Sequence, residues 1–160
     1  MTGVCQVDFQ LHLETETVEQ AYPARPVCAG PGESIRRILR LLKERNTGAV
    51  LLCENQRLVG IFTERDALRV LADDISLDQP VANVMSANPV TLRPKDTLGR
   101  AIVLMSSGGF RRLPIVDSHG KVLGLLKVSG VLRYLVEQFP KVIYTLPPTP
   151  HHHTSDRHGA

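Results

Sequence analysis

Several residue types that define common protein classes are scarce in this 160-residue chain. The three cysteines, Cys5, Cys28 and Cys53, form no Cys-x-x-Cys pair, so neither a disulfide framework nor a zinc site is predicted. Tryptophan is absent and aromatic residues make up 4%, which is little for a surface that stacks nucleic-acid bases. No apolar run approaches the ~20 residues of a membrane helix. The net charge of +3 is too small to indicate nucleic-acid binding by itself.

The remaining composition is that of a folded globular protein. Hydrophobic residues make up 42% and charged residues 22%, which argues against disorder of the whole chain. Residues 1–19 carry acids and no basic n-region, so no signal peptide is predicted and a cytoplasmic location is expected. The length suits one domain, or two small units that share one core.

An internal repeat organises most of the chain. The paired stretches share prolines, a valine, an acid, a hydroxyl residue and aliphatic positions, and they are 26–35 with 89–98, 57–62 with 121–126, and 68–71 with 132–135. The offset is 63 residues at first and 64 after one insertion. We interpret residues 26–72 and 89–136 as two copies of one unit.

Each copy has the pattern of a β-α-β-β-α unit. In the first helix of copy one, apolar residues recur at i, i+3, i+4 and i+7 from Ile35, and the same spacing begins at Leu98 in copy two. Ser34 and Thr97 are candidate N-caps. The other predicted elements are strands at 49–53, 58–62, 113–116 and 122–126, and helices at 64–71 and 128–138. Because about 47 residues bury too little surface alone, we predict an α+β fold whose two units pack sheet to sheet with pseudo-twofold symmetry.

The flanks and the segment between the copies carry weaker patterns. Apolar and polar residues alternate over 7–14, which suggests an N-terminal strand. A short helical turn is expected before Met85, and the prolines at 147–150 predict an extended or disordered tail. The histidines at 151–153 do not by themselves make a metal site. The expected division is an N-terminal flank at 1–24, motif one at 25–75, a linker at 76–88, motif two at 89–138 and a tail at 139–160.

Specific stretches of both copies carry a family resemblance. They are Thr47–Leu52, Val59–Leu68, Val84–Thr91, Phe110–Asp117 and Val122–Gly124. Together they resemble two CBS motifs (named after cystathionine beta-synthase), a tandem pair known as a Bateman module, over most of residues 24–138. The resemblance implies a non-catalytic regulatory module that binds an adenosyl ligand, namely AMP, ADP, ATP, S-adenosylmethionine or NAD, in the cleft between the motifs. It also implies a homodimer. Because the flanks of about 25 residues are too short for an effector domain, we expect the module to signal in trans to an effector protein or to buffer its ligand.

The ligand signature of this family stands intact once, as Gly60-Ile61-Phe62-Thr63-Glu64-Arg65-Asp66. Thr63 falls where a strand ends and a helix begins, which is a natural phosphate position. Asp66 lies one helical turn further on, and its carboxylate can accept hydrogen bonds from both ribose hydroxyls. Thr63 and Asp66 also fit a capping box that merely starts a helix, and the two interpretations are compatible.

The resemblance assigns the remaining ligand contacts. It implies that Ile61 flanks the adenine and that Asn88, Pro89 and Val90 supply backbone contacts to the base. Arg111 and Arg112 resemble a basic pair that reaches ligand phosphates, and guanidinium groups suit phosphate oxygens. The alternative is that they are surface arginines beside a glycine turn.

The second copy departs from the signature. Lys127 replaces the threonine and Gly130 replaces the aspartate, so the ribose clamp is missing there. We therefore predict one strong nucleotide site per chain. Lys127 could serve as a point charge for phosphate, or simply as a solvated lysine at a strand end.

Other functional classes find little support in the chain. No G-x-S-x-G, H-E-x-x-H or P-loop motif occurs, so no enzyme activity and no catalytic or metal-binding residue is predicted. The basic residues of the first helix suit its solvated face better than a nucleic-acid surface. The alternative to the ligand-binding module is a protein- or nucleic-acid-interaction scaffold without a small ligand.

Overall fold

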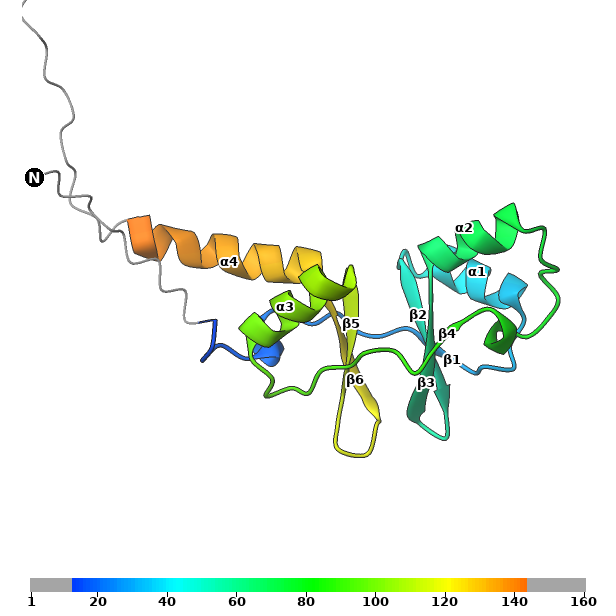
Figure 1. The fold of residues 1–160 in the computed structure, drawn as a ribbon, viewed down its shortest axis with the longest axis horizontal. Helices are drawn as coiled ribbons and strands as arrows, with labels where there is room; N and C mark the ends of the chain where they lie inside the picture. The colour runs from blue at the N-terminus through cyan, green and yellow to red at the C-terminus, as the bar shows by residue number, and fades with distance from the viewer. Residues whose placement is uncertain (1–12, 144–160) are drawn as a thin grey trace, which may run out of the picture.

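The computed structural model describes residues 13–143 and shows two units side by side, each a small sheet covered by two helices (Figure 1). The first unit contains β1 (Cys28–Ala29), α1 (Ile35–Glu44), β2 (Ala49–Glu54), β3 (Arg57–Thr63) and α2 (Glu64–Ala72). The second contains α3 (Leu98–Gly108), β5 (Arg112–Val116), β6 (Val122–Lys127) and α4 (Val128–Ile143). The segments before them hold η1 (Val18–Gln20), η2 (Val81–Asn83) and β4 (Ser86–Ala87). This order confirms the predicted α+β repeat.

Local hydrogen bonds explain where the helices begin. The Ser34 hydroxyl accepts the Arg37 N–H at 3.3 Å, and the Thr97 hydroxyl accepts the Arg100 N–H at 3.2 Å, as N-caps do. Helix α4 runs to Ile143, past its predicted end at residue 138. The predicted N-terminal strand falls almost entirely outside the described residues, as do the prolines and histidines of the tail.

The two sheets exchange edge segments. Strand order in the first sheet is β1-β2-β3-β4, with β1 parallel to β2 and the other pairs antiparallel. Strand β4 precedes the second unit, yet it completes the sheet of the first. In the second sheet, Ala24 forms an antiparallel bridge with Leu125, and Leu92 a parallel one with Ile115. Each unit therefore borrows an edge from the segment that leads into the other, and these segments cross between the units (Figure 1).

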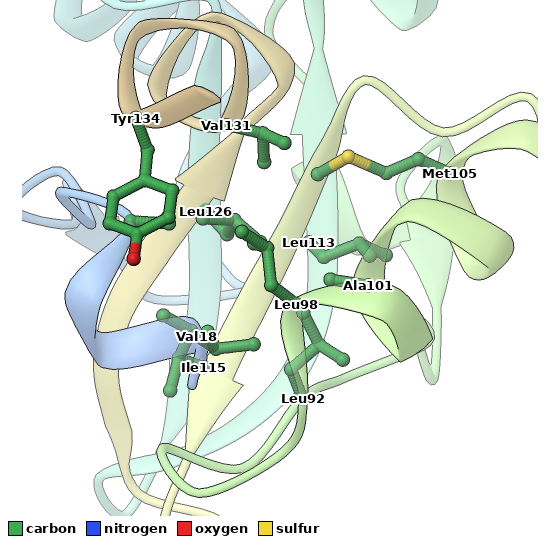
Figure 2. Packing of buried hydrophobic residues seen from close by; sticks show 11 residues of the cluster. Val18, Leu92, Leu98, Ala101, Met105, Leu113, Ile115, Leu126, Val131 and Tyr134 are labelled. Carbon is green, nitrogen blue, oxygen red and sulfur yellow. The ribbon is translucent and has the colours of Figure 1, made fainter. Parts of the chain in front are cut away.

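Three clusters of buried side chains form the core. One lies under α1 and α2, around Ile35, Val50 and Phe62. A second lies under α3 and α4, and Figure 2 shows Leu98, Leu113, Leu126 and other members packed together. The third joins the sheets and contains Ala49, Leu51, Ile61 and Leu125. Each large side chain buried in this way stabilises the fold by roughly 1.5–3 kcal/mol, so the third cluster holds the two sheets face to face.

Among the described residues, no helix has both the length and the hydropathy of a membrane span.

Candidate functional site

A cleft of about 640 Å³ opens where the two units meet. Its walls come from the end of β3, the first two turns of α2, the segment 86–90 and the segment 109–114 at the start of β5. Eight of the nine predicted site residues line this cleft: Ile61, Thr63, Asp66, Asn88, Pro89, Val90, Arg111 and Arg112. The chain thus brings together, from both repeats, residues that are up to about fifty positions apart.

Asp66 and Thr63 form a connected pair at the start of α2. The backbone N–H and the hydroxyl of Thr63 both donate to Oδ2 of Asp66, at 2.8 and 2.9 Å. The capping-box interpretation is therefore correct for the structure. The other carboxylate oxygen, Oδ1, has a single long contact of 3.7 Å to Nη1 of Arg69. The Thr63 hydroxyl donates its hydrogen to Oδ2 of Asp66. Oδ1 of Asp66 and the Thr63 hydroxyl oxygen therefore remain as acceptors for the O–H groups of a ligand.

Burial makes this pair the most constrained polar group of the cleft. Asp66 is 4% exposed, and it is the one charged residue among those described that is fully buried. Buried carboxylates are retained only where hydrogen bonds compensate for lost hydration. The Thr63 bonds supply that compensation and hold the carboxylate in one orientation.

The segment Asn88–Val90 follows β4 and forms a further part of the cleft lining. Asn88 has a φ of 48°, the left-handed conformation that asparagine adopts more readily than most residues, and its N–H donates to the Val59 carbonyl at 3.1 Å. This turn ends the pairing of β4 with β3 and directs Pro89 and Val90 along the cleft.

The two arginines of the predicted basic pair have different surroundings. Nη2 of Arg112 lies 3.3 Å from Oε2 of Glu64 on α2, and its guanidinium covers Gly48 so closely that a methyl group at position 48 would overlap it. Arg111 forms no ion pair within residues 13–143, and its backbone carbonyl accepts the Val128 N–H at 3.0 Å. One arginine is thus fixed between the units and the other extends freely at the mouth of the cleft.

Apolar side chains on the rim of the cleft stay uncovered. Leu68, Val90 and Phe110 all line the cleft and are all exposed. Phe110 follows the left-handed cap at Gly109, and its ring folds back over Gly108, where any side chain would collide with it. Exposed apolar residues gathered at a concave site are typical of ligand-binding surfaces.

Lys127, the ninth predicted site residue, is not among the residues that line this cleft. It ends β6 and is the register partner of Arg112, just as Thr63 ends β3. The repeat therefore makes Lys127 the counterpart of Thr63 in the other unit. Because directly opposite residues of an antiparallel pair project to the same face of the sheet, Lys127 lies on the same side as Arg112. Its contact with phosphate stays a prediction.

The second unit is packed differently at the position that matches Asp66. A Cβ atom at Gly130 would lie 2.9 Å from the Ala21 carbonyl oxygen and 3.5 Å from that of Tyr22. Tyr22 in turn donates to Glu137, while Arg133 lies 4.9 Å from the centre of its ring. The Tyr22 hydrogen bond, followed by that from Arg133, lowers the pKa of Glu137. The chain's own backbone thus occupies the place of a second ribose clamp.

Sequence reasoning missed several residues that line the cleft, notably Glu64, Arg65 and Phe110. Glu64 and Arg65 fill the two variable positions of the signature, for which the motif specifies no residue type. Phe110 precedes the predicted arginine pair, and a phenylalanine next to a turn could have suggested an exposed ring. Within residues 13–143, no group of three or more His, Cys, Asp or Glu side chains is arranged to hold a metal ion.

Comparison with known proteins places these features in a family. The model of the CBS domain matches residues 18–73 and again 81–137. CBS domain-containing protein YhcV of Bacillus subtilis is 35% identical over 107 residues, which cover 66% of this chain and 76% of YhcV. An uncharacterised 17.7 kDa protein of Acidianus ambivalens is 30% identical over 121 residues, which cover 75% of this chain and 73% of that protein.

A solved structure shows the same architecture. The CBS domain protein PAE2072 from Pyrobaculum aerophilum, complexed with AMP, superposes with a TM-score of 0.70 at 23% identity. The match covers 78% of this chain and 98% of that one. Two family-model matches in register with the repeat, and a fold shared with a CBS domain protein, agree with each other. The chain therefore belongs to the CBS domain family and carries a tandem pair of CBS domains.

Proposed function

We propose that this chain is a non-catalytic regulatory module that binds an adenosyl ligand in the cleft between its two CBS domains. The observation that carries the proposal is the composition of that one cleft. It combines a buried carboxylate with a free oxygen, exposed apolar side chains and several arginines, which suit in turn a ribose, an adenine and phosphate. The complex of PAE2072 with AMP supports the same assignment by analogy.

The charges of the cleft favour a phosphate-bearing ligand. Four arginines, at positions 65, 69, 111 and 112, line it against the two acids Glu64 and Asp66. The resulting net positive charge attracts AMP, ADP, ATP or NAD and disfavours the cationic sulfonium of S-adenosylmethionine. We therefore place the adenine nucleotides first among the candidate ligands.

The test is calorimetric titration of the wild-type chain and of Asp66→Ala with AMP, ADP, ATP, NAD, S-adenosylmethionine and GTP. Loss of the Asp66 carboxylate removes the ribose acceptor, so we expect adenine-nucleotide binding to fall at least tenfold. The variant also loses a helix cap worth about 1 kcal/mol, which a thermal melt measures separately. Asp96→Ala is the matched control, because Asp96 also accepts a backbone N–H, from Arg93 at 2.8 Å, but lies outside the cleft.

The outcome distinguishes a ligand-binding module from an interaction scaffold without a small ligand. Binding by the wild type and by Asp96→Ala, but not by folded Asp66→Ala, is the expected result. Equal affinity of folded Asp66→Ala, or no binding of any of these compounds by the wild type, would contradict the proposal and favour an interaction scaffold.

We further propose that the chain acts as a homodimer and signals in trans. Leu68 on α2 and Leu132 on α4 are exposed at repeat-related positions of the second helix of each unit, and Leu71 and Val136 add a further exposed apolar side chain to each of these helices. Apolar helix faces of this kind are suited to burial against another protein. The same faces are the observation that favours the alternative, a protein-interaction scaffold with no small ligand.

A further inference from the structure

One ion pair bridges the two CBS domains across the cleft. Glu64, the first residue of α2, meets Arg112, the first residue of β5, with 3.3 Å between Oε2 and Nη2. The other ion pairs of the described residues each stay within one unit and the segment packed on it. The cleft therefore contains an acid that already neutralises one of its cations before any ligand enters.

The two partners are held to very different degrees. The Arg112 side chain is 25% exposed, and both its guanidinium and the Glu64 carboxylate lie over Gly48, where an added Cβ atom would overlap Nη2 and come within 2.7 Å of Oε2. The Glu64 side chain is 65% exposed and makes no other hydrogen bond or ion pair within residues 13–143. The pair can therefore open by rotation of Glu64 alone, while Arg112 keeps its place.

The contact with Glu64 also engages only part of the hydrogen-bonding capacity of the Arg112 guanidinium. One guanidinium nitrogen meets one carboxylate oxygen, whereas guanidinium groups bind carboxylate or phosphate most strongly through two parallel N–H donors. A phosphate dianion brings two negative charges and three acceptor oxygens to the same place. Arg65 and Arg111, which line the cleft and form no ion pair in the described chain, add to its attraction.

We propose that Glu64 is the resident counter-ion of Arg112, and that the phosphate of a bound nucleotide displaces it. This inference rests on the proposed function, and it adds a specificity-determining residue to that site. Glu64 sets a threshold, because a ligand must outcompete it to reach Arg112. An adenosyl compound without phosphate leaves the pair intact, and a phosphorylated one exchanges a bond between the two domains for bonds through the ligand.

The test compares Glu64→Gln with the wild type in calorimetric titrations with AMP and with adenosine. Glutamine keeps the size of the side chain and removes its charge, so the competition for Arg112 ends. We expect AMP to bind about three- to tenfold more tightly, the range set by one partly screened charge, and adenosine to bind unchanged. Glu44→Gln is the control, because it removes the same charge from an exposed residue of α1 outside the cleft and should change neither affinity.

A double variant asks whether Glu64 acts through Arg112. In an Arg112→Ala background, Glu64→Gln should lose most of its gain in AMP affinity, because the guanidinium for which Glu64 and the phosphate compete is absent. Unchanged AMP affinity in Glu64→Gln, or an equal gain for adenosine, would overturn the inference while nucleotide binding itself stands. Absence of AMP binding in both the wild type and Glu64→Gln would instead overturn the proposed function, and this inference with it.

Discussion

Replacing Gly130 with aspartate would restore the aspartate of the family signature in the second domain, though not its threonine, and we predict that it destabilises the chain and creates no second site. Gly130 is the third residue of α4, so aspartate should gain from helix propensity and from its place near a helix N-terminus, roughly 0.1–0.3 and 0.3–1 kcal/mol. The structure opposes this gain. The new Cβ would lie 2.9 Å from the Ala21 carbonyl oxygen, and overpacking of this kind costs about 1–3 kcal/mol.

The aspartate carboxylate adds a second cost. It would face the carbonyl oxygens of Ala21 and Tyr22, which are acceptors, and an unpartnered polar group costs about 1–3 kcal/mol. The net loss centres on about 3 kcal/mol, which lowers the melting temperature by about 6–12 °C for a chain of this size. Thermal melts measure the loss, and calorimetry counts the bound nucleotides.

A neighbouring residue provides the matched control for this prediction. Ser129 is exposed and lies one position earlier in the same helix turn, so Ser129→Asp adds the charge without the collision. We expect a change within about 0.5 kcal/mol for that variant. A Gly130→Asp protein that melts at or above the wild-type temperature, or that binds two nucleotides per chain, would refute the reasoning.

Two further predictions concern the thiols and the helix faces. Burial, reinforced by the neighbouring Cys28 thiol, raises the pKa of Cys53 to about 12. At pH 8 a disulfide reagent should therefore modify exposed Cys28 quickly and Cys53 slowly. Equal rates of modification in the Cys28→Ser and Cys53→Ser variants would contradict this prediction. If the apolar faces of α2 and α4 join two copies, the wild type should be a dimer by light scattering, and Leu132→Glu should be a monomer of unchanged helical content; a dimeric variant would exclude this face.

The repeat and the helix caps were predictable because their causes are local. Ser34 and Thr97 cap their helices through residues three positions away, and the apolar spacing from Ile35 determines which face is buried. Two copies in register then determine the fold class, since neither unit buries enough surface alone. The gathering of Asp66 with the segment from Asn88 followed from the family resemblance.

The parts that could not be predicted depend on contacts between distant segments. Nothing near Glu64 in the sequence indicates that Arg112 is its partner, and nothing near Gly130 indicates that the Ala21 carbonyl oxygen lies against it. The contact of Lys127 with phosphate stays a prediction, because this residue is the register partner of Arg112 but is not among those that line the cleft.

The exchange of edge segments has a consequence for the order in which the chain folds during synthesis. The first sheet closes on β4, which follows it within a short stretch of chain, so this sheet can be complete soon after residue 87 has left the ribosome. The second sheet must pair Leu125 with Ala24, a contact between opposite ends of the repeat region whose loop closure is costly. The strands on either side of Asp66 and Asn88 can therefore pair first, but they become stable only when the second unit supplies Leu125 to the shared cluster, which also brings the arginines of β5 to the cleft.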